Sequence, residues 1–528
     1  MNFYSQLASF LNNYLIRNKL KKKFKKLFKS DDIKGRRIIL IEFNHWPIFH
    51  IAGAYLTYVI SKKYPSKIIG FYNNCYIDNY LEINVLKKIK IFILQFLNLR
   101  NFGIYKSFNV KKILYPNLNK NQKIIAKKKF LNISKKIKNK SDILSIKINN
   151  INIGDLLYDS FLKRYSLATI DINSYNFRNY LKLFIYLFIY WDFFFKKNNV
   201  KSLIVSHSVY STAIPLRIAI NNGIKCYVPN TNYLYALSKK RLLTDLEYLD
   251  FKMKFLQLNH EIKKKSLLIA KNSLLKRFKG SFSKDIYYSK NLSFKNINYN
   301  KIKFDKNKFN VLIAAHSFSD SPHIYGDLLF NDFYEWLIFL GHLSKKTEYN
   351  WYIKDGPDYP LINEFILNQF TINFPNIKLL PRNCSHHLLV KNIDLVLTCY
   401  GTIAHEYPYF NVPVINASKN NPHKDYKFSI HPKNILDYKI KILQAKKLKI
   451  KINKNEIFEF YYMKYKYYKI GWCFNLENFL NKYGYKIFIP NLMYNFWMKS
   501  FSEKKHKKIL DNLSKFIDNK DYIFQIKD

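Results

Sequence analysis

Arginine is scarce in a chain that is otherwise strongly basic. Of the 89 basic residues, 79 are lysine and only 10 arginine, and they are scattered through every segment. Specific recognition of bases or phosphates favours the bidentate Arg fork, so the composition counts against specific nucleic-acid binding despite a net charge of +53. Glycine and proline are also few, at 13 and 15. We interpret this bias as that of an AT-rich coding sequence, with attraction to an anionic membrane surface or to nucleic acid as alternatives.

Cysteine and long apolar runs are scarce as well. The five cysteines lie far apart without C-x-x-C spacing, which argues against a zinc or redox centre and fits a reducing cytoplasm. The longest apolar stretch, 181–195, is interrupted by Asp192 and is shorter than the roughly 20 residues that span a bilayer, so it predicts a buried helix. No signal peptide is predicted, because the first charges follow the apolar part and a small-residue cleavage site is missing. The cysteines are Cys75, Cys226, Cys384, Cys399 and Cys473.

Residues 1–30 combine lysines with apolar residues at helical spacing. Leu7, Leu11, Leu20, Phe24 and Leu27 recur on one face of a predicted helix. Such a basic amphipathic helix can lie on an anionic leaflet; the alternative is a solvated helix packed on its own domain. We therefore expect a cytoplasmic protein, with peripheral attachment to the inner face of the cytoplasmic membrane left open.

The 528 residues suggest two or three domains, and 48% hydrophobic with 18% aromatic residues excludes wholesale disorder. Strands and helices alternate in both halves, which predicts the α/β class: two Rossmann-like parallel-sheet domains that face a cleft, plus a helical C-terminal tail. Expected strands are 37–43, 67–72, 201–207, 224–228, 310–316, 349–354, 376–381, 394–398 and 412–417. Expected segments are the helix 1–30, an acceptor domain 31–234, a helical and polar connector 235–305, a donor-binding domain 306–435 and a helical extension 436–528.

Polar residues gather directly after the predicted strands, where parallel sheets bind ligands. Eight of the 13 histidines fall between His316 and His431. No H-E-x-x-H or comparable spacing and no Asp-x-Asp pair appears, so no metal site is predicted, although a histidine cluster keeps one as an alternative. The candidate ligand-binding residues in these loops are His316, Ser317, Lys354, Asn421 and His423.

The stretch DLVLTCYGTIAHEYP, residues 394–408, is the most informative motif. A strand ends at Thr398, Gly401 allows close approach of the backbone, and Thr402 is predicted to cap a helix over 402–409 whose first turn offers N–H groups to phosphate oxygens. His405 and Glu406, one turn later, are candidates for binding sugar hydroxyls. A buried connecting helix is the alternative for this motif.

The pattern D-x-V-x-T-x-Y-G-T-x-x-x-E followed by V-P-V-I, residues 394–415, resembles bacterial surface and capsular polysaccharide glycosyltransferases of GT-B architecture. The nearest group is the capsule-synthesis enzymes that use CMP-activated sugars. The resemblance implies an inverting, metal-independent glycosyltransferase without a cofactor, with a CMP- or UDP-linked donor in the C-terminal half and a polysaccharide or lipid-linked glycan acceptor in the N-terminal half. By position, Gly401 and Thr402 would lie at the donor phosphates and Glu406 near the ribose. Relatives carry Lys-Pro-His-Pro where this chain has Lys354, Asp355 and Gly356 before a proline.

An inverting transfer needs a base that removes the proton of the acceptor hydroxyl. His45 is the predicted base, as several GT-B enzymes place theirs after the first strand; His50 and Asp320 are the fallback residues. Three other functions stay open: a nucleotide-sugar 2-epimerase, a CDP-polyol phosphotransferase, and a non-enzymatic protein that binds polyanions or a membrane surface. The chain length and the basic amphipathic start favour a transferase over an epimerase.

Overall fold

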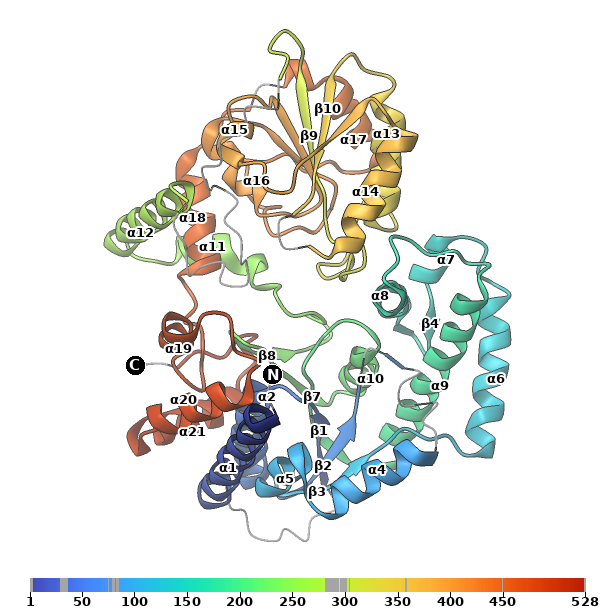
Figure 1. The fold of residues 1–528 in the computed structure, drawn as a ribbon, viewed down its shortest axis with the longest axis vertical. Coiled ribbons are helices and arrows are strands. Elements are labelled where there is room, and N and C mark those ends of the chain that lie inside the picture. Colours follow the sequence, from blue (N-terminus) through green and yellow to red (C-terminus); the bar gives the residue numbers. More distant parts are fainter. Residues whose placement is uncertain are drawn as a thin grey trace. The chain divides into compact units, whose positions relative to one another are not determined.

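The computed structural model describes residues 3–28, 37–74, 76, 77, 81, 85–280, 294, 302, 304–356, 359–448 and 450–526. The chain forms two compact units (Figure 1). Unit 1 contains Met1–Ser160, Asp171–Thr244 and Lys469–Asp528, and unit 2 contains Phe161–Ile170 and Asp245–Tyr468. The expected helical extension 436–528 is thus divided between the units at Tyr468, and most of the expected connector that is described belongs to unit 2.

Unit 1 is built on a six-stranded sheet with the order β3-β2-β1-β6-β7-β8. All neighbours pair in parallel except β7 and β8, which are antiparallel. The central strands are apolar runs buried on both faces, as parallel strands under covering helices must be. The strands are β1 (Arg37–Phe43), β2 (Ser66–Tyr72), β3 (Val110–Leu114), β6 (Val200–Ile204), β7 (Lys225–Pro229) and β8 (Leu234–Leu237), and a short hairpin joins β4 (Lys147–Ile148) to β5 (Ile151–Asn152).

Helices cover both faces of this sheet. Side chains of α1, α2, α20 and α21 share one core with β1, and Trp191 of α9 packs edge-on against Phe71 of β2 on the sheet, with ring centroids 4.9 Å apart. The prediction that 181–195 forms a buried helix is confirmed by α9. Among the described residues, no helix combines the length and hydropathy needed to cross a bilayer. The helices are α1 (Phe3–Leu27), α2 (Pro47–Lys63), α4 (Val85–Phe96), α5 (Arg100–Ser107), α6 (Lys120–Ser134), α7 (Lys140–Leu144), α8 (Gly154–Tyr165), α9 (Tyr175–Lys197), α10 (Ile214–Asn221), α19 (Leu476–Tyr483), α20 (Pro490–Ser500) and α21 (Glu503–Asp518). The last turn of α8, from Phe161, belongs to unit 2.

Unit 2 is built on a five-stranded, all-parallel sheet with the order β11-β10-β9-β12-β13. Side chains of α13, α14 and α17 pack on one face, and those of α15 and α16 on the other. The strands are β9 (Asn310–Ala314), β10 (Asn350–Lys354), β11 (Ile377–Leu380), β12 (Leu395–Thr398) and β13 (Val414–Asn416). The helices are α11 (Phe251–Leu256), α12 (His260–Phe278), α13 (Phe333–Ser344), α14 (Leu361–Asn373), α15 (His386–Leu389), α16 (Ile403–Glu406), α17 (Ile435–Leu443) and α18 (Lys454–Tyr465).

The predicted fold class, two Rossmann-like parallel sheets in an α/β chain, is confirmed. In unit 1 the chain runs outward from β1 through β2 to β3, and then returns to the other side of β1 with β6 and β7. Unit 2 repeats this path with β9, β10 and β11, followed by β12 and β13. The strand order therefore reverses between β1 and β6 and between β9 and β12. The carboxyl ends of the strands at such a switch point are where parallel sheets bind ligands.

Candidate functional site

In unit 2 a histidine joins the ends of the two strands that flank the switch point. His316 follows β9, and its Nε2 lies 3.1 Å from the backbone nitrogen of Cys399 and 3.0 Å from Oγ1 of Thr398, both at the end of β12. Because the N–H of Cys399 donates, Nε2 carries the lone pair and Nδ1 the proton. Burial lowers the pKa of His316 to about 3, so the ring is neutral at physiological pH. His316 therefore connects the two loops that flank the switch point.

The Gly401–Thr402 turn follows the end of β12 in the chain. A Cβ on Gly401 would lie 3.0 Å from Oγ1 of Thr398 and 3.8 Å from Cε1 of His316, so a side chain there would press on the connection between the loops. The prediction that Thr402 caps a helix over 402–409 is wrong, because Thr402 has helical backbone angles, its side chain makes no capping hydrogen bond, and α16 covers only Ile403–Glu406. The Thr402 hydroxyl is therefore not used as a cap. The N–H groups of Ala404, His405 and Glu406 donate to the carbonyl oxygens of Gly401 and Thr402, which leaves the N–H groups of Thr402 and Ile403 for a ligand.

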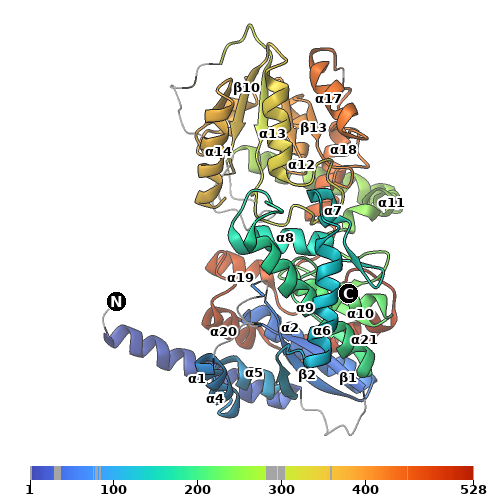
Figure 2. The ribbon, with the colours of Figure 1, turned by 90° about the vertical axis from the view of Figure 1, so that its right-hand side faces the viewer.

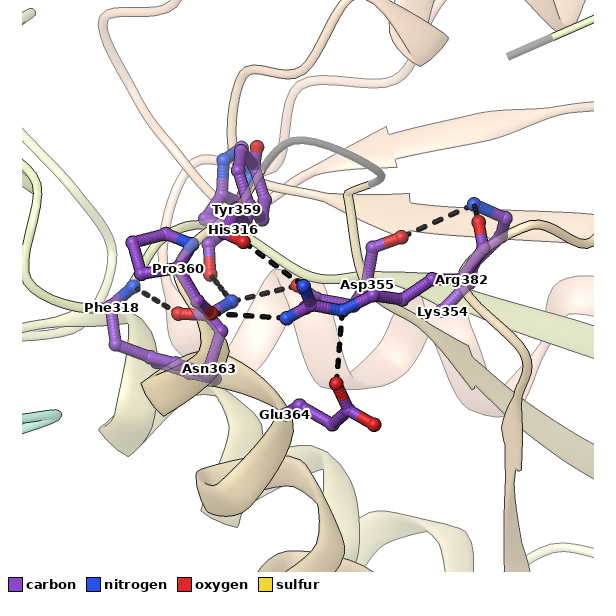
Figure 3. A network of polar contacts seen from close by, with 9 residues as sticks. All are labelled: His316, Phe318, Lys354, Asp355, Tyr359, Pro360, Asn363, Glu364 and Arg382. Carbon is purple, nitrogen blue, oxygen red and sulfur yellow. Dashed lines mark hydrogen bonds and ion pairs between the residues drawn. The ribbon is translucent and has the colours of Figure 1, made fainter. Parts of the chain in front are cut away.

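Lys354 ends β10, but its ammonium group is not directed to a ligand position. Its Nζ donates to the carbonyl oxygens of Asp355, at 3.2 Å, and Arg382, at 3.1 Å (Figure 3). The residue is buried, and burial lowers the pKa of Lys354 to about 8. The expected contact of Lys354 with a diphosphate has no support in this arrangement, because both carbonyl contacts lie within the loops after β10 and β11.

Asn363 of α14 ties two loops of the site together. Its Nδ2 donates to the carbonyl oxygen of His316, at 3.0 Å, and to Oδ1 of Asp355, at 2.8 Å (Figure 3). Its Oδ1 accepts from the backbone nitrogen of Phe318 at 3.2 Å. The Asp355 carboxylate also pairs with Arg382. Sequence reasoning missed Asn363 because a single asparagine in a helix has no signal until its neighbours are known.

Glu406 of α16 forms a buried ion pair. Its Oε1 lies 2.6 Å from Nε of Arg277 on α12, and the Glu406 side chain is 2% exposed. The carboxylate raises the pKa of Arg277 against the opposing effect of burial. The predicted contact of Glu406 with a ribose remains a prediction, and any such contact would form beside a guanidinium group that already neutralises the carboxylate.

His405 and His423 contact each other inside unit 2. Nδ1 of His405 lies 3.1 Å from Nε2 of His423, and both rings pack on Phe460. Burial lowers the pKa of both, for His405 to about 3, so the pair is neutral. The amide of Asn421 is used within its own loop, since it donates to the carbonyl oxygen of Ser418 at 3.0 Å and accepts from the His423 backbone at 3.0 Å. These residues hold the loop after β13, and their predicted roles toward a sugar or base remain predictions.

Ser317 and Asp320 lie in the loop after β9. Ser317 is half-buried, and its carbonyl oxygen accepts from the Asp320 backbone nitrogen at 3.2 Å. The Asp320 carboxylate pairs with Lys163 at 2.9 Å. A carboxylate paired with lysine is a weaker proton acceptor, so this contact does not favour Asp320 as the base.

In unit 1 a buried carboxylate occupies the corresponding switch point. Glu42 in β1 is 2% exposed, and its Oε1 accepts from Oγ of Ser206, at 2.6 Å, and from Nδ2 of Asn44, at 2.9 Å. Its Oε2 accepts from the Ser206 backbone nitrogen at 2.9 Å and from Nδ2 of Asn73 at 3.3 Å. Ser206 follows β6, so Glu42 connects the two strands across the switch point. The signal that could have identified Glu42 is that it is the single acidic residue in the otherwise apolar run IILIEF.

His207 and His45 stand at this edge in opposite tautomers. Oγ of Ser206 gives its proton to Glu42, so it must accept from Nδ1 of His207, 2.8 Å away, and the lone pair of His207 is then on Nε2. Nδ1 of His45 instead accepts from Nδ2 of Asn101 at 2.7 Å, which places the His45 proton on Nε2. Packing around the ring and the guanidinium groups of nearby arginines lower the pKa of His45. In this tautomer the outer nitrogen of His45 donates, which does not favour the predicted role as base.

His50 is a satisfied structural histidine. Its Nε2 donates to the carbonyl oxygen of Asn44 at 2.8 Å, and its Nδ1 accepts from the hydroxyl of Tyr494 at 2.6 Å. It is fully buried, and burial lowers its pKa to about 3. Both nitrogens are used inside unit 1, so the geometry does not favour His50 as the base.

Metal ligands do not gather in the part of the chain that the structure describes: no three His, Cys, Asp or Glu side chains there are placed to hold an ion. Cys75 lies outside the described residues, and the other four cysteines are buried thiols.

No protein-family model matches the chain, and no curated protein matches it. Solved structures that it is similar to include the β-Kdo 2,4-transferase of KpsC from Thermosulfurimonas dismutans, with 12% identity over 50% of this chain and 79% of that chain and a TM-score of 0.31. Another is the UDP-GlcNAc 2-epimerase from Neisseria meningitidis, with 9% identity over 80% of this chain and 97% of that chain and a TM-score of 0.22. Likeness at these TM-scores supports no activity, so the function must be inferred from the residues of this chain.

Proposed function

We propose that the protein is a glycosyltransferase that moves a sugar from a nucleotide-sugar donor to a surface polysaccharide or lipid-linked glycan. The observation that carries the proposal is the switch point of unit 2. There the turn that begins at Gly401 brings the N–H groups of Thr402 and Ile403 and the Thr402 hydroxyl to the carboxyl end of a parallel sheet. His316 and Asn363 hold the facing loop. Backbone N–H groups and a hydroxyl are suitable donors to the phosphates of a CMP- or UDP-linked sugar.

Unit 1 supplies the proton acceptor in this proposal. The acceptor hydroxyl oxygen attacks the anomeric carbon, the bond from that carbon to the phosphate oxygen breaks, and the configuration inverts. A general base must remove the hydroxyl proton, and the candidate in unit 1 is Nε2 of His207, because Ser206 and Glu42 orient its ring and the carboxylate would stabilise the imidazolium. The negative charge of the departing nucleotide is stabilised by the donors of the Gly401–Thr402 turn.

The first test is nucleotide binding measured by titration calorimetry with CMP, UDP, CDP and GDP. One of them should bind, and Thr402→Val should weaken that binding about tenfold, the effect of one hydrogen bond to a charged group. Thr371→Val is the matched control, since the Thr371 hydroxyl bonds only to carbonyls of its own helix, α14.

The second test is turnover. The proposal expects nucleotide release from a CMP- or UDP-sugar that depends on an added glycan acceptor. Interconversion of a UDP-sugar without any acceptor would instead establish an epimerase, and release of CMP only from CDP-polyols would establish a phosphotransferase. Absence of nucleotide binding, or equal binding by the Thr402 variant, would overturn the assignment of the site.

A further inference from the structure

Helix α4 exposes an unusually large amount of apolar surface. Leu86, Phe92 and Phe96 are 77%, 67% and 73% exposed. The Phe92 and Phe96 rings stack on each other, with centroids 6.2 Å apart. The full set of exposed apolar side chains in and after the helix is Val85, Leu86, Ile89, Phe92, Ile93, Phe96, Leu97 and Leu99. A contiguous patch of this kind marks an interaction surface rather than scattered surface residues.

These side chains form one broad stripe. At 100° per residue, positions 85, 89, 92 and 96 fall on one line of the helix, and 86, 93 and 97 form the adjacent line. The opposite side, with Ile91 and Leu94, packs against the core of unit 1. The exposed lysines Lys88 and Lys90 fall on the two flanks of the stripe. A stripe bordered by lysines suits a helix that lies in the plane of a bilayer interface, because the lysine ammonium groups can reach the head groups.

Basic residues dominate the segments that pack beside α4. Helix α5 packs against both α1 and α4, and the three helices lie together in both views (Figures 1 and 2). The sequence 13–28 contains seven Lys or Arg, 85–115 contains another seven, and neither segment contains Asp or Glu. Lys19, Lys22, Lys25 and Lys26 of α1 are exposed.

The described part of the apolar face of α1 is buried, and the membrane role expected for residues 1–30 remains a prediction. Leu20, Phe24 and Phe28 are buried in the core of unit 1, and Leu27 packs against it. The side chains of Leu7 and Leu11 lie outside the described residues. The described part of α1 therefore offers mainly charge to a membrane, with Tyr14 and Leu15 also exposed, whereas the larger exposed apolar surface belongs to α4.

We propose that α4 inserts its apolar stripe into the interface of an anionic bilayer, with the lysines of α1 and α4 contacting the lipid phosphates. Positive charge alone would fit any polyanion. The eight large apolar side chains that face solvent gain nothing from RNA or DNA, whereas contact with acyl chains is favourable for them. A second copy of the chain is less suitable as the occupant, since two such surfaces would bring their lysines together. This inference rests on α4 and does not depend on the proposed enzymatic activity.

The test is co-sedimentation of the full chain with vesicles of phosphatidylglycerol and phosphatidylethanolamine, compared with pure phosphatidylcholine. Wild type should bind the anionic vesicles, and added salt should weaken binding. The double variant Phe92→Glu, Phe96→Glu should lower the partition coefficient by about tenfold or more per side chain. Phe365→Glu is the matched control, because Phe365 on α14 of unit 2 is also 61% exposed.

A second measurement locates the helix directly. The added emission of Phe92→Trp, taken as the difference from wild type, should shift to the blue on anionic vesicles and be quenched by brominated lipid, and that of Phe365→Trp should not. Equal vesicle binding by wild type and the Phe92 and Phe96 variant would overturn the proposal, as would no binding at all. A wild-type dimer that this variant dissociates, seen by light scattering, would assign the surface to a second copy instead.

Discussion

The two switch points have the same strand topology but opposite chemistry. In unit 1, Glu42 connects β1 to the residue after β6 and accepts all its hydrogen bonds from neutral donors. In unit 2, neutral His316 connects the loop after β9 to the end of β12, and the N–H groups of Thr402 and Ile403 with the Thr402 hydroxyl follow. A parallel sheet thus sets where a ligand can bind, whereas the connecting residue sets what kind of group is favoured. The switch point of unit 1 favours a ligand that donates a proton or develops positive charge, and the switch point of unit 2 favours an anionic ligand.

The largest expected effect concerns the switch point of unit 1, where Glu42 lies. His207→Gln should lower acceptor-dependent turnover about 100-fold to 10,000-fold, the usual contribution of a general base, whereas His45→Gln should lower it by less than about tenfold. Glu42→Gln should lower the pKa seen in the pH profile of kcat, because the imidazolium loses a nearby negative charge. The measurement is kcat and kcat/KM across pH for the three variants. A larger loss for His45→Gln than for His207→Gln would return the role of base to His45.

The second prediction concerns acid stability and uses the buried histidines. His316 and His405 have pKa values lowered to about 3, against about 6.5 in an unfolded chain. The unfolded chain then binds more protons between these values, so stability is complete above pH 6.5 and falls as the pH drops toward 3. At pH 5 each of these two histidines should lower the free energy of unfolding by about 2 kcal/mol relative to pH 7.

Unit 2 should therefore be the more acid-sensitive unit. Burial also lowers the pKa of His386, His423 and His431 in unit 2, whereas in unit 1 it lowers the pKa of His45, His50 and His506. Hydrogen exchange from pH 7 to pH 5, followed separately for peptides of β9 and β12 and of β1 and β6 and corrected for the intrinsic pH dependence, measures this. Equal loss of protection in the two units would contradict the assignment of neutral histidines to unit 2.

The sheets were predictable because their central strands are short apolar runs bounded by polar residues, as in 37–43 and 394–398. Strand β3 was missed because Lys111 and Lys112 break the apolar pattern of an edge strand, and β8 because it lies close to a polar segment. The sequence predicted which loops form the candidate site, but not which contacts their side chains make. That Lys354 would donate to backbone carbonyls depends on contacts between loops that no local pattern encodes. The sequence also did not predict that the apolar stripe of α4 is exposed, because an apolar helix normally packs in a core.

The smallest expected effect compares two buried asparagines that hold the loops of each unit. Asn363→Leu removes the bonds to His316, Phe318 and Asp355, and Asn73→Leu removes those to Glu42 and to the carbonyl oxygen of Thr212. Each should lower the free energy of unfolding by about 1–3 kcal/mol, because buried groups lose their partners. Only Asn363→Leu should also weaken nucleotide binding, since it releases the loop that faces the Gly401–Thr402 turn. Denaturant unfolding and calorimetric titration of both variants separate the two effects. Equal weakening of nucleotide binding by Asn73→Leu would contradict the inference that the nucleotide binds at the switch point of unit 2 alone.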